Sequence, residues 1–203
     1  MKIKYNSPVV LTFVFLCAFI LLLNQTLFHN LIQLWFTAPS KTNFSSSDPR
    51  DWIDLVTHAL GHASWNHLTG NLLIILIVGP MLEDIYGSVS LLVMMFITAF
   101  VTGGINALFF STGLLGASGI VFMMILLASF TNFRKGEIPL TFILVLIFYV
   151  GNEVISSFKN DGIAHFVHII GGFCGSVFGF FKKTTDNRIE RSGVAGKQAN
   201  SGQ

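Results

Sequence analysis

A serine and a histidine, each close to glycines, are the residues of this chain best suited to nucleophilic chemistry. Ser118 stands in the stretch Gly116-Ala117-Ser118-Gly119, inside an apolar run. His168 lies 50 residues later, also in an apolar run. A serine hydroxyl is a poor nucleophile near neutral pH and needs a base within hydrogen-bond reach to accept its proton. Ser118 as the nucleophile and His168 as the general base therefore form a candidate catalytic dyad.

Glycines recur every four residues after His168 and leave one face of that segment without side chains. They are Gly171, Gly175 and Gly179. Small residues at this spacing let the backbone of a second helix approach closely. Gly116 and Gly119 make their own segment the natural counterpart. Close packing of the two segments would bring Ser118 to His168.

Each member of the dyad also has a role that involves no chemistry. A serine in a membrane helix can return its hydroxyl to a carbonyl one turn earlier, and a lone histidine can be a satisfied interior residue. His165 is a competing base on a neighbouring helical face, three residues before His168. We favour His168 because His165 lies nearer the outer interface, just before the glycine-lined stretch.

A second pair of polar residues, His67 and Asn71, could stabilise negative charge. They stand four apart and so share one face of a helix. Both can donate hydrogen bonds to the oxyanion that forms when a carbonyl becomes tetrahedral. Either residue alone could equally well bond a neighbouring helix.

Other chemically capable residues suggest simpler roles. His58 and His62 also stand four apart, but the His-Glu-x-x-His arrangement of zinc proteases is absent. We therefore predict neither a metal nor another cofactor. Glu83 ends an apolar run, where a capping or interface role is expected, and it is not well placed to extend the dyad to a triad. Two cysteines, Cys17 and Cys174, lie in apolar runs and are expected to be packing residues.

The composition indicates that lipid is the solvent for most of this chain. Of its 203 residues, 52% are hydrophobic and 11% are charged, whereas soluble domains carry about 25% charged residues. The net charge of +2 does not point to a nucleic-acid partner. Six apolar runs are long enough to cross a hydrocarbon core of about 30 Å. They predict an all-α polytopic membrane protein with spans at 8–29, 64–86, 89–110, 114–133, 138–157 and 163–181.

The lysines and arginines predict how these spans are oriented. In a six-span chain, nine of them fall on one side and three on the other, so the positive-inside rule places both termini in the cytoplasm. Residues 1–181 would form the membrane domain, and the polar residues 182–203 a disordered cytoplasmic tail. His67, Ser118 and His168 would then lie at a similar depth near the extracytoplasmic side. Polar groups inside a membrane usually face a partner or a water-filled cavity.

Three motifs, in this order, resemble those of the rhomboid intramembrane serine proteases. They are His62-Ala-Ser-Trp-Asn-His67-Leu-Thr-Gly-Asn71, Gly116-Ala-Ser118-Gly119 and Ala164-His165-Phe-Val-His168-Ile-Ile-Gly171-Gly172. The similarity covers roughly residues 50–181. It implies a six-helix rhomboid-like bundle without a cofactor that cleaves transmembrane proteins in or near the lipid bilayer. It also implies a multi-pass protein of the cell membrane, and we expect this to be a bacterial plasma membrane.

The resemblance implies a role for each matching residue. Ser118 would attack the peptide carbonyl, and His168 would act first as the base and then as the acid for the leaving amine. The backbone N–H of Ser118 would form an oxyanion pocket with the side chains of His67 and Asn71. Supporting roles would fall to His62 and Gly116, and close packing to Gly119, Gly171 and Gly175. Residues 30–63 would be the membrane-embedded first loop of the family.

Two positions depart from the family pattern. Many rhomboids carry a Trp-Arg pair in the first loop, whereas Trp52 is followed here by Ile53 and Asp54. Many also place a tyrosine four residues after the serine, where it stacks on the catalytic histidine. That position is Phe122 in this chain. A phenylalanine keeps the ring and loses the hydroxyl, so we expect the stacking to remain.

Two other functions stay open at this point. One is a non-proteolytic member of the same fold that binds membrane proteins and aids their trafficking or turnover. Such relatives typically lack the serine or the histidine, and this chain has both. The other is a metal or haem membrane protein that uses His58, His62, His165 and His168.

Overall fold

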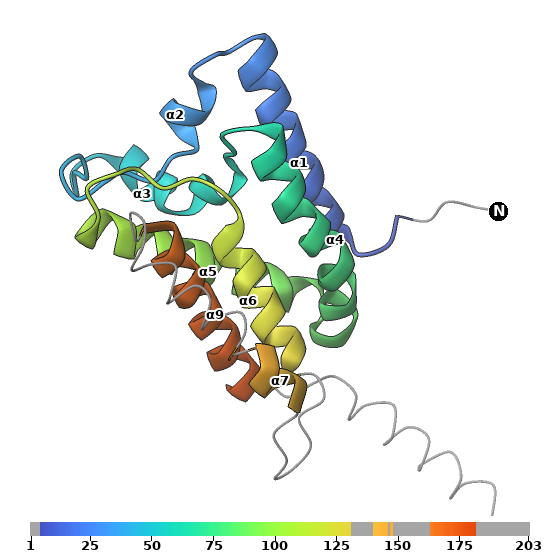
Figure 1. The fold of residues 1–203 in the computed structure, drawn as a ribbon. Coiled ribbons are helices and arrows are strands. Elements are labelled where there is room, and N and C mark those ends of the chain that lie inside the picture. Colours follow the sequence, from blue (N-terminus) through green and yellow to red (C-terminus); the bar gives the residue numbers. More distant parts are fainter. Residues whose placement is uncertain (1–4, 131–139, 146, 148–162, 182–203) are drawn as a thin grey trace, which may run out of the picture.

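The computed structural model describes residues 5–130, 140–145, 147 and 163–181. Within these ranges the chain forms a helical bundle (Figure 1), and its one pairing of extended backbone is an isolated bridge between Ala38 and Leu114. The helices are α1 (Pro8–Thr26), α2 (Leu31–Trp35), α3 (Pro49–Thr57), η1 (His58–Leu60), α4 (Trp65–Tyr86), α5 (Ser88–Phe109), α6 (Ser118–Ser129), α7 (Leu140–Val145) and α9 (Ile163–Phe181). The all-helical fold predicted from the sequence is confirmed for the described residues.

Three of these helices are long and apolar enough to cross a membrane. They are α1, α4 and α5, with mean hydropathies of 2.2, 1.6 and 2.0. Two shorter apolar stretches belong to the same bundle: α6 and the part of α9 from Phe166 to Phe181. The chain is therefore a multi-pass membrane protein. Most of the predicted span 138–157 and the whole predicted tail 182–203 lie outside the described residues.

Two helix boundaries differ from the prediction by three or four residues. The predicted helix 114–133 is wrong at its start, because α6 begins at Ser118. Leu114 pairs instead with Ala38, and Gly116 has a φ of 116°, which a right-handed helix does not allow. The predicted helix 8–29 ends at Thr26. There the Asn24 side chain accepts the N–H of Ile32 at 3.0 Å, which holds the turn into α2.

A buried carboxylate joins α1, α4 and α5 at one end of the bundle. Glu83, near the end of α4, is only 4% exposed. Its carboxylate oxygens accept the N–H groups of Val9 and Val10 at 3.1 and 3.0 Å, and the hydroxyl of Ser88 at 2.7 Å. The first N–H groups of a helix have no partner within it, and a carboxylate there is favourable. The expected capping role of Glu83 is confirmed.

The first loop is fastened by a pair of residues distant in sequence. The guanidinium of Arg50 in α3 lies over the ring of Trp35 in α2, with Cζ 4.9 Å from the ring centroid. Arg50 Nε also lies 3.7 Å from Asp54 Oδ2. The Thr57 hydroxyl donates to the carbonyl of Trp35 at 2.8 Å. The loop therefore has an anchoring arginine and tryptophan without the adjacent Trp-Arg pair of many rhomboids.

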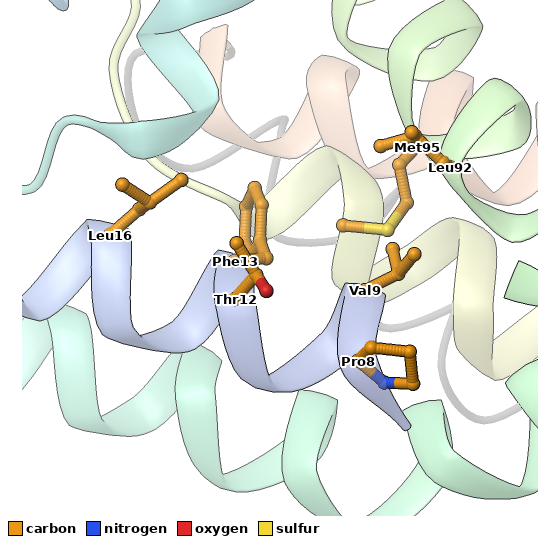
Figure 2. Close-up of a pocket in the computed structure, with 7 residues that line it drawn as sticks. All are labelled: Pro8, Val9, Thr12, Phe13, Leu16, Leu92 and Met95. Atoms are coloured by element: carbon orange, nitrogen blue, oxygen red, sulfur yellow. The ribbon is translucent and has the colours of Figure 1, made fainter. Parts of the chain in front are cut away.

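A shallow groove of about 270 Å³ runs between α1 and α5 (Figure 2). It is lined by Pro8, Val9, Thr12, Phe13, Leu16, Leu92 and Met95. These residues carry no charge and no activated nucleophile, and they belong to the N-terminal parts of the two helices. The groove thus lies toward the Glu83 end of the bundle, away from the start of α6.

Candidate active site

Ser118 is the first residue of α6, so its backbone N–H has no hydrogen-bond acceptor within that helix. The two preceding N–H groups are already bonded elsewhere. Gly116 N donates to the carbonyl of His58 at 2.9 Å, and Ala117 N donates to His62 Nε2 at 3.4 Å. Hydrogen bonds therefore fix the backbone of the two residues that precede Ser118.

The glycines of α9 bring its backbone against that of α6, and the two helices run side by side in Figure 1. A Cβ added at Gly171 would overlap the carbonyl oxygen of Gly119, and one at Gly175 would overlap the carbonyl oxygen of Met123. Gly119 is also enclosed by α5, because a Cβ there would lie 3.1 Å from Thr102 Cγ2. Backbone-to-backbone contact of this kind needs residues without side chains at the crossing.

His168 lies on α9 next to the turn that Ser118 begins. Its imidazole stacks on the ring of Phe122, with centroids 4.2 Å apart and planes inclined by 9°. Phe122 is four residues after Ser118 and so lies one helical turn further along the same face of α6. The stacking expected from the sequence is present. His165 also lies in α9, but its side chain is outside the described residues.

Of the side chains proposed for the oxyanion pocket, that of His67 lies against the Gly116 backbone. A Cβ added at Gly116 would lie 2.7 and 2.8 Å from Cε1 and Nε2 of His67, so the imidazole faces this backbone directly. The Asn71 amide donates to the carbonyl of His67 at 3.2 Å, which uses one of its two N–H groups. The rings of His62 and His67 meet edge-on, 5.1 Å apart.

His62 is held in one tautomer by its two neighbours. Its Nδ1 lies 3.3 Å from the carbonyl of Leu60, so that nitrogen carries the proton and Nε2 accepts from Ala117. Burial, assisted by the nearby His67, lowers the pKa of His62 to about 4, although the Leu60 hydrogen bond acts in the opposite direction. His62 is therefore neutral at pH 7, as its acceptor role requires.

His58 makes its side-chain hydrogen bond with a different element from His62. Its Nε2 donates to the carbonyl of Ala99 in α5 at 3.1 Å. Burial lowers the pKa of His58 to about 4, and the bond to Ala99 opposes that shift. His58 and His62 thus each bond to backbone groups of different residues, Ala99 for His58 and Leu60 and Ala117 for His62. Cys17 and Cys174 are buried free thiols.

The family of the chain follows from comparison with known proteins. A model of the rhomboid domain matches residues 49–184. The chain belongs to the rhomboid family. This rhomboid is also 26% identical over 179 residues to "Rhomboid protease GlpG" of Haemophilus influenzae, a match that covers 86% of this chain and 91% of that protein. The matched region contains Ser118 and His168, so the proposed dyad lies within the family domain.

One buried polar residue of this region, Asn106, belongs to none of the sequence motifs. Asn106, in the last turn of α5, is fully buried. Its amide donates to the carbonyls of Pro39 at 3.1 Å and Thr112 at 3.0 Å. The signal that could have identified it is the cost of placing a polar side chain in an apolar membrane run.

Proposed function

We propose that this rhomboid is an intramembrane serine endopeptidase that uses Ser118 and His168 as a catalytic dyad. The observation that carries the proposal is the stacking of His168 on Phe122, one turn after Ser118. The contact of Gly171 with Gly119 supports it, because it brings the backbones of α9 and α6 together beside the serine. A base held on this face of α6 can accept the serine proton as the hydroxyl attacks.

The reaction would proceed through an acyl-enzyme. Ser118 Oγ attacks the carbonyl carbon of the scissile bond while His168 takes the hydroxyl proton, and His168 then protonates the leaving amine. Water, activated by the same histidine, hydrolyses the ester and restores Ser118. The Ser118 N–H and the side chains of His67 and Asn71 would donate to the oxyanion of each tetrahedral intermediate.

The substrate would be a transmembrane protein cut in or near its membrane segment. In the proposed topology residues 1–181 form six spans, both termini are cytoplasmic, and residues 182–203 are a cytoplasmic tail. Ser118, at the start of span four, would then lie toward the extracytoplasmic surface of a bacterial plasma membrane. The positive-inside distribution of lysine and arginine supports this orientation.

Cleavage of a model transmembrane substrate by purified protein in detergent tests the proposal. The parent should cut the substrate, whereas Ser118→Ala should not and should keep the same thermal unfolding temperature. Equal cleavage by the two proteins would refute the dyad. Binding of the substrate without cleavage by the parent would instead favour a non-proteolytic rhomboid.

A further inference from the structure

Asn106 makes two hydrogen bonds to backbone groups that are far apart in sequence. Its side-chain nitrogen donates to the carbonyl of Pro39 in the first loop and to the carbonyl of Thr112, which precedes α6. Carbonyl oxygens only accept, so the NH₂ group of the amide must point at both. Asn106 is 0% exposed, which removes water as a competing partner.

The two segments that Asn106 joins are also paired through their backbones. We call residues 110–117 the nucleophile segment, because they lead into Ser118. Ala38 and Leu114 exchange both hydrogen bonds, at 2.8 and 3.1 Å, and Lys41 N donates to the carbonyl of Phe110 at 2.7 Å. Asn106, which belongs to α5, thus donates one hydrogen bond to the first loop and one to the nucleophile segment, beside their backbone pairing.

This pairing also contacts the part of α9 that carries His168. Ala38 and Leu114 form a small buried cluster with Val167, the residue before His168. At the other end of the pairing, the ring of Phe110 packs against Phe166 at a centroid distance of 5.3 Å. The nucleophile segment is therefore held between the first loop and the part of α9 that carries the base.

We propose that Asn106 is a positioning residue that fastens the nucleophile segment to the first loop and so sets the place of Ser118. The inference rests on the proposed function of Ser118. Only five residues lie between Thr112 and Ser118, so a shift of the segment is passed to the serine. A displacement of about 1 Å at a reacting group can cost about 100-fold in rate.

The test replaces Asn106 by an apolar residue of similar size that cannot donate a hydrogen bond. In Asn106→Leu, methyl groups would face the carbonyls of Pro39 and Thr112. Leu91→Ala is the matched control, because Leu91 is equally buried on α5. It lies 15 residues earlier, which is about 22 Å along the helix. Asn106→Ala removes the same donors with a smaller side chain and serves if Asn106→Leu does not fold.

Two readouts are measured below the unfolding temperature of each protein. Hydrogen exchange at residues 38–41 and 110–114 should become at least about tenfold faster in the Asn106 variants and stay unchanged in Leu91→Ala. Their kcat on a model transmembrane substrate should fall about 10- to 100-fold, with KM within about twofold of the parent value. Leu91→Ala should keep kcat.

Either readout can overturn the proposal. Unchanged exchange would show that Asn106 does not hold the two segments together. Faster exchange with parental kcat in the Asn106 variants, or an equal loss of kcat in Leu91→Ala, would show that the Asn106 hydrogen bonds do not position the serine. A parent protein without proteolytic activity would refute the proposed function instead. The exchange experiment would still test whether Asn106 holds the nucleophile segment to the first loop.

Discussion

Two adjacent glycines of α9, Gly171 and Gly172, offer a sharp test of how the proposed dyad is assembled. A Cβ at Gly171 would overlap the backbone carbonyl of Gly119, which cannot rotate away. A Cβ at Gly172 would lie 3.4 Å from Leu126 Cδ2, in ordinary van der Waals contact. Gly171→Ala and Gly172→Ala therefore add the same methyl group to the same helix, with opposite expected consequences.

The expected magnitudes follow from these contacts. Replacing glycine by alanine inside a helix stabilises by roughly 0.5–1 kcal/mol, so Gly172→Ala should unfold at the parental temperature or slightly above it. In Gly171→Ala the backbones of α6 and α9 must separate by about an ångström to relieve the overlap, and overpacking of this kind costs about 1–3 kcal/mol. The same separation moves His168 from Ser118, which should reduce the rate about 100-fold.

Thermal unfolding in detergent and the rate of labelling by a fluorophosphonate probe give the two quantities separately. Gly171→Ala should lose labelling at temperatures where it is fully folded, and Gly172→Ala should react like the parent. If both variants label at the parental rate, the α6–α9 contact does not hold the base at the serine.

Three further predictions concern Phe122, the buried carboxylate of Glu83 and two buried histidines. Phe122→Tyr should keep the stack on His168 and the cleavage rate, whereas Phe122→Leu should lose an aromatic contact of about 0.5–1.5 kcal/mol and cleave about tenfold more slowly; equal rates would contradict the role of stacking. Glu83→Gln leaves one of two helix N–H groups facing an amide NH₂, so it should lower stability by about 1–3 kcal/mol without changing kcat, as thermal unfolding and cleavage assays would show. His58 and His62 have pKa values lowered to about 4 from an unfolded value near 6.5. Each neutral form therefore stabilises the fold fully above about pH 6.5, and this stability, on the order of 3 kcal/mol each, is lost as the pH falls toward 4. Unfolding temperatures should fall between pH 6.5 and 5, where ordinary carboxylates stay ionised, and a flat profile would contradict the burial of these rings.

Local patterns in the sequence predict much of the bundle. The apolar runs predict α1, α4, α5 and α9 to within a few residues, because a buried or lipid-facing helix must be apolar over its whole length. The glycine spacing after His168 predicts which face of α9 is bare. The four-residue step from Ser118 to Phe122 predicts the ring available for stacking, since such steps share a helix face.

Contacts between distant parts of the chain could not be predicted in this way. The start of α6 depends on Ala38, which pairs with Leu114 across 76 residues of sequence. Glu83 caps a helix that begins 75 residues earlier at Pro8. Local periodicity reports the face that a residue occupies and says nothing of the element opposite.

Covalent labelling of purified parent protein by a fluorophosphonate, followed by peptide mass mapping, tests the proposed dyad most directly. The expected result is a single phosphonylated residue, Ser118, with labelling abolished in Ser118→Ala and strongly slowed in His168→Ala. The matched comparison is His165→Ala, which should label at nearly the parental rate. Labelling that persists in Ser118→Ala, or that is slowed by His165→Ala and not by His168→Ala, would contradict the assignment of nucleophile or base.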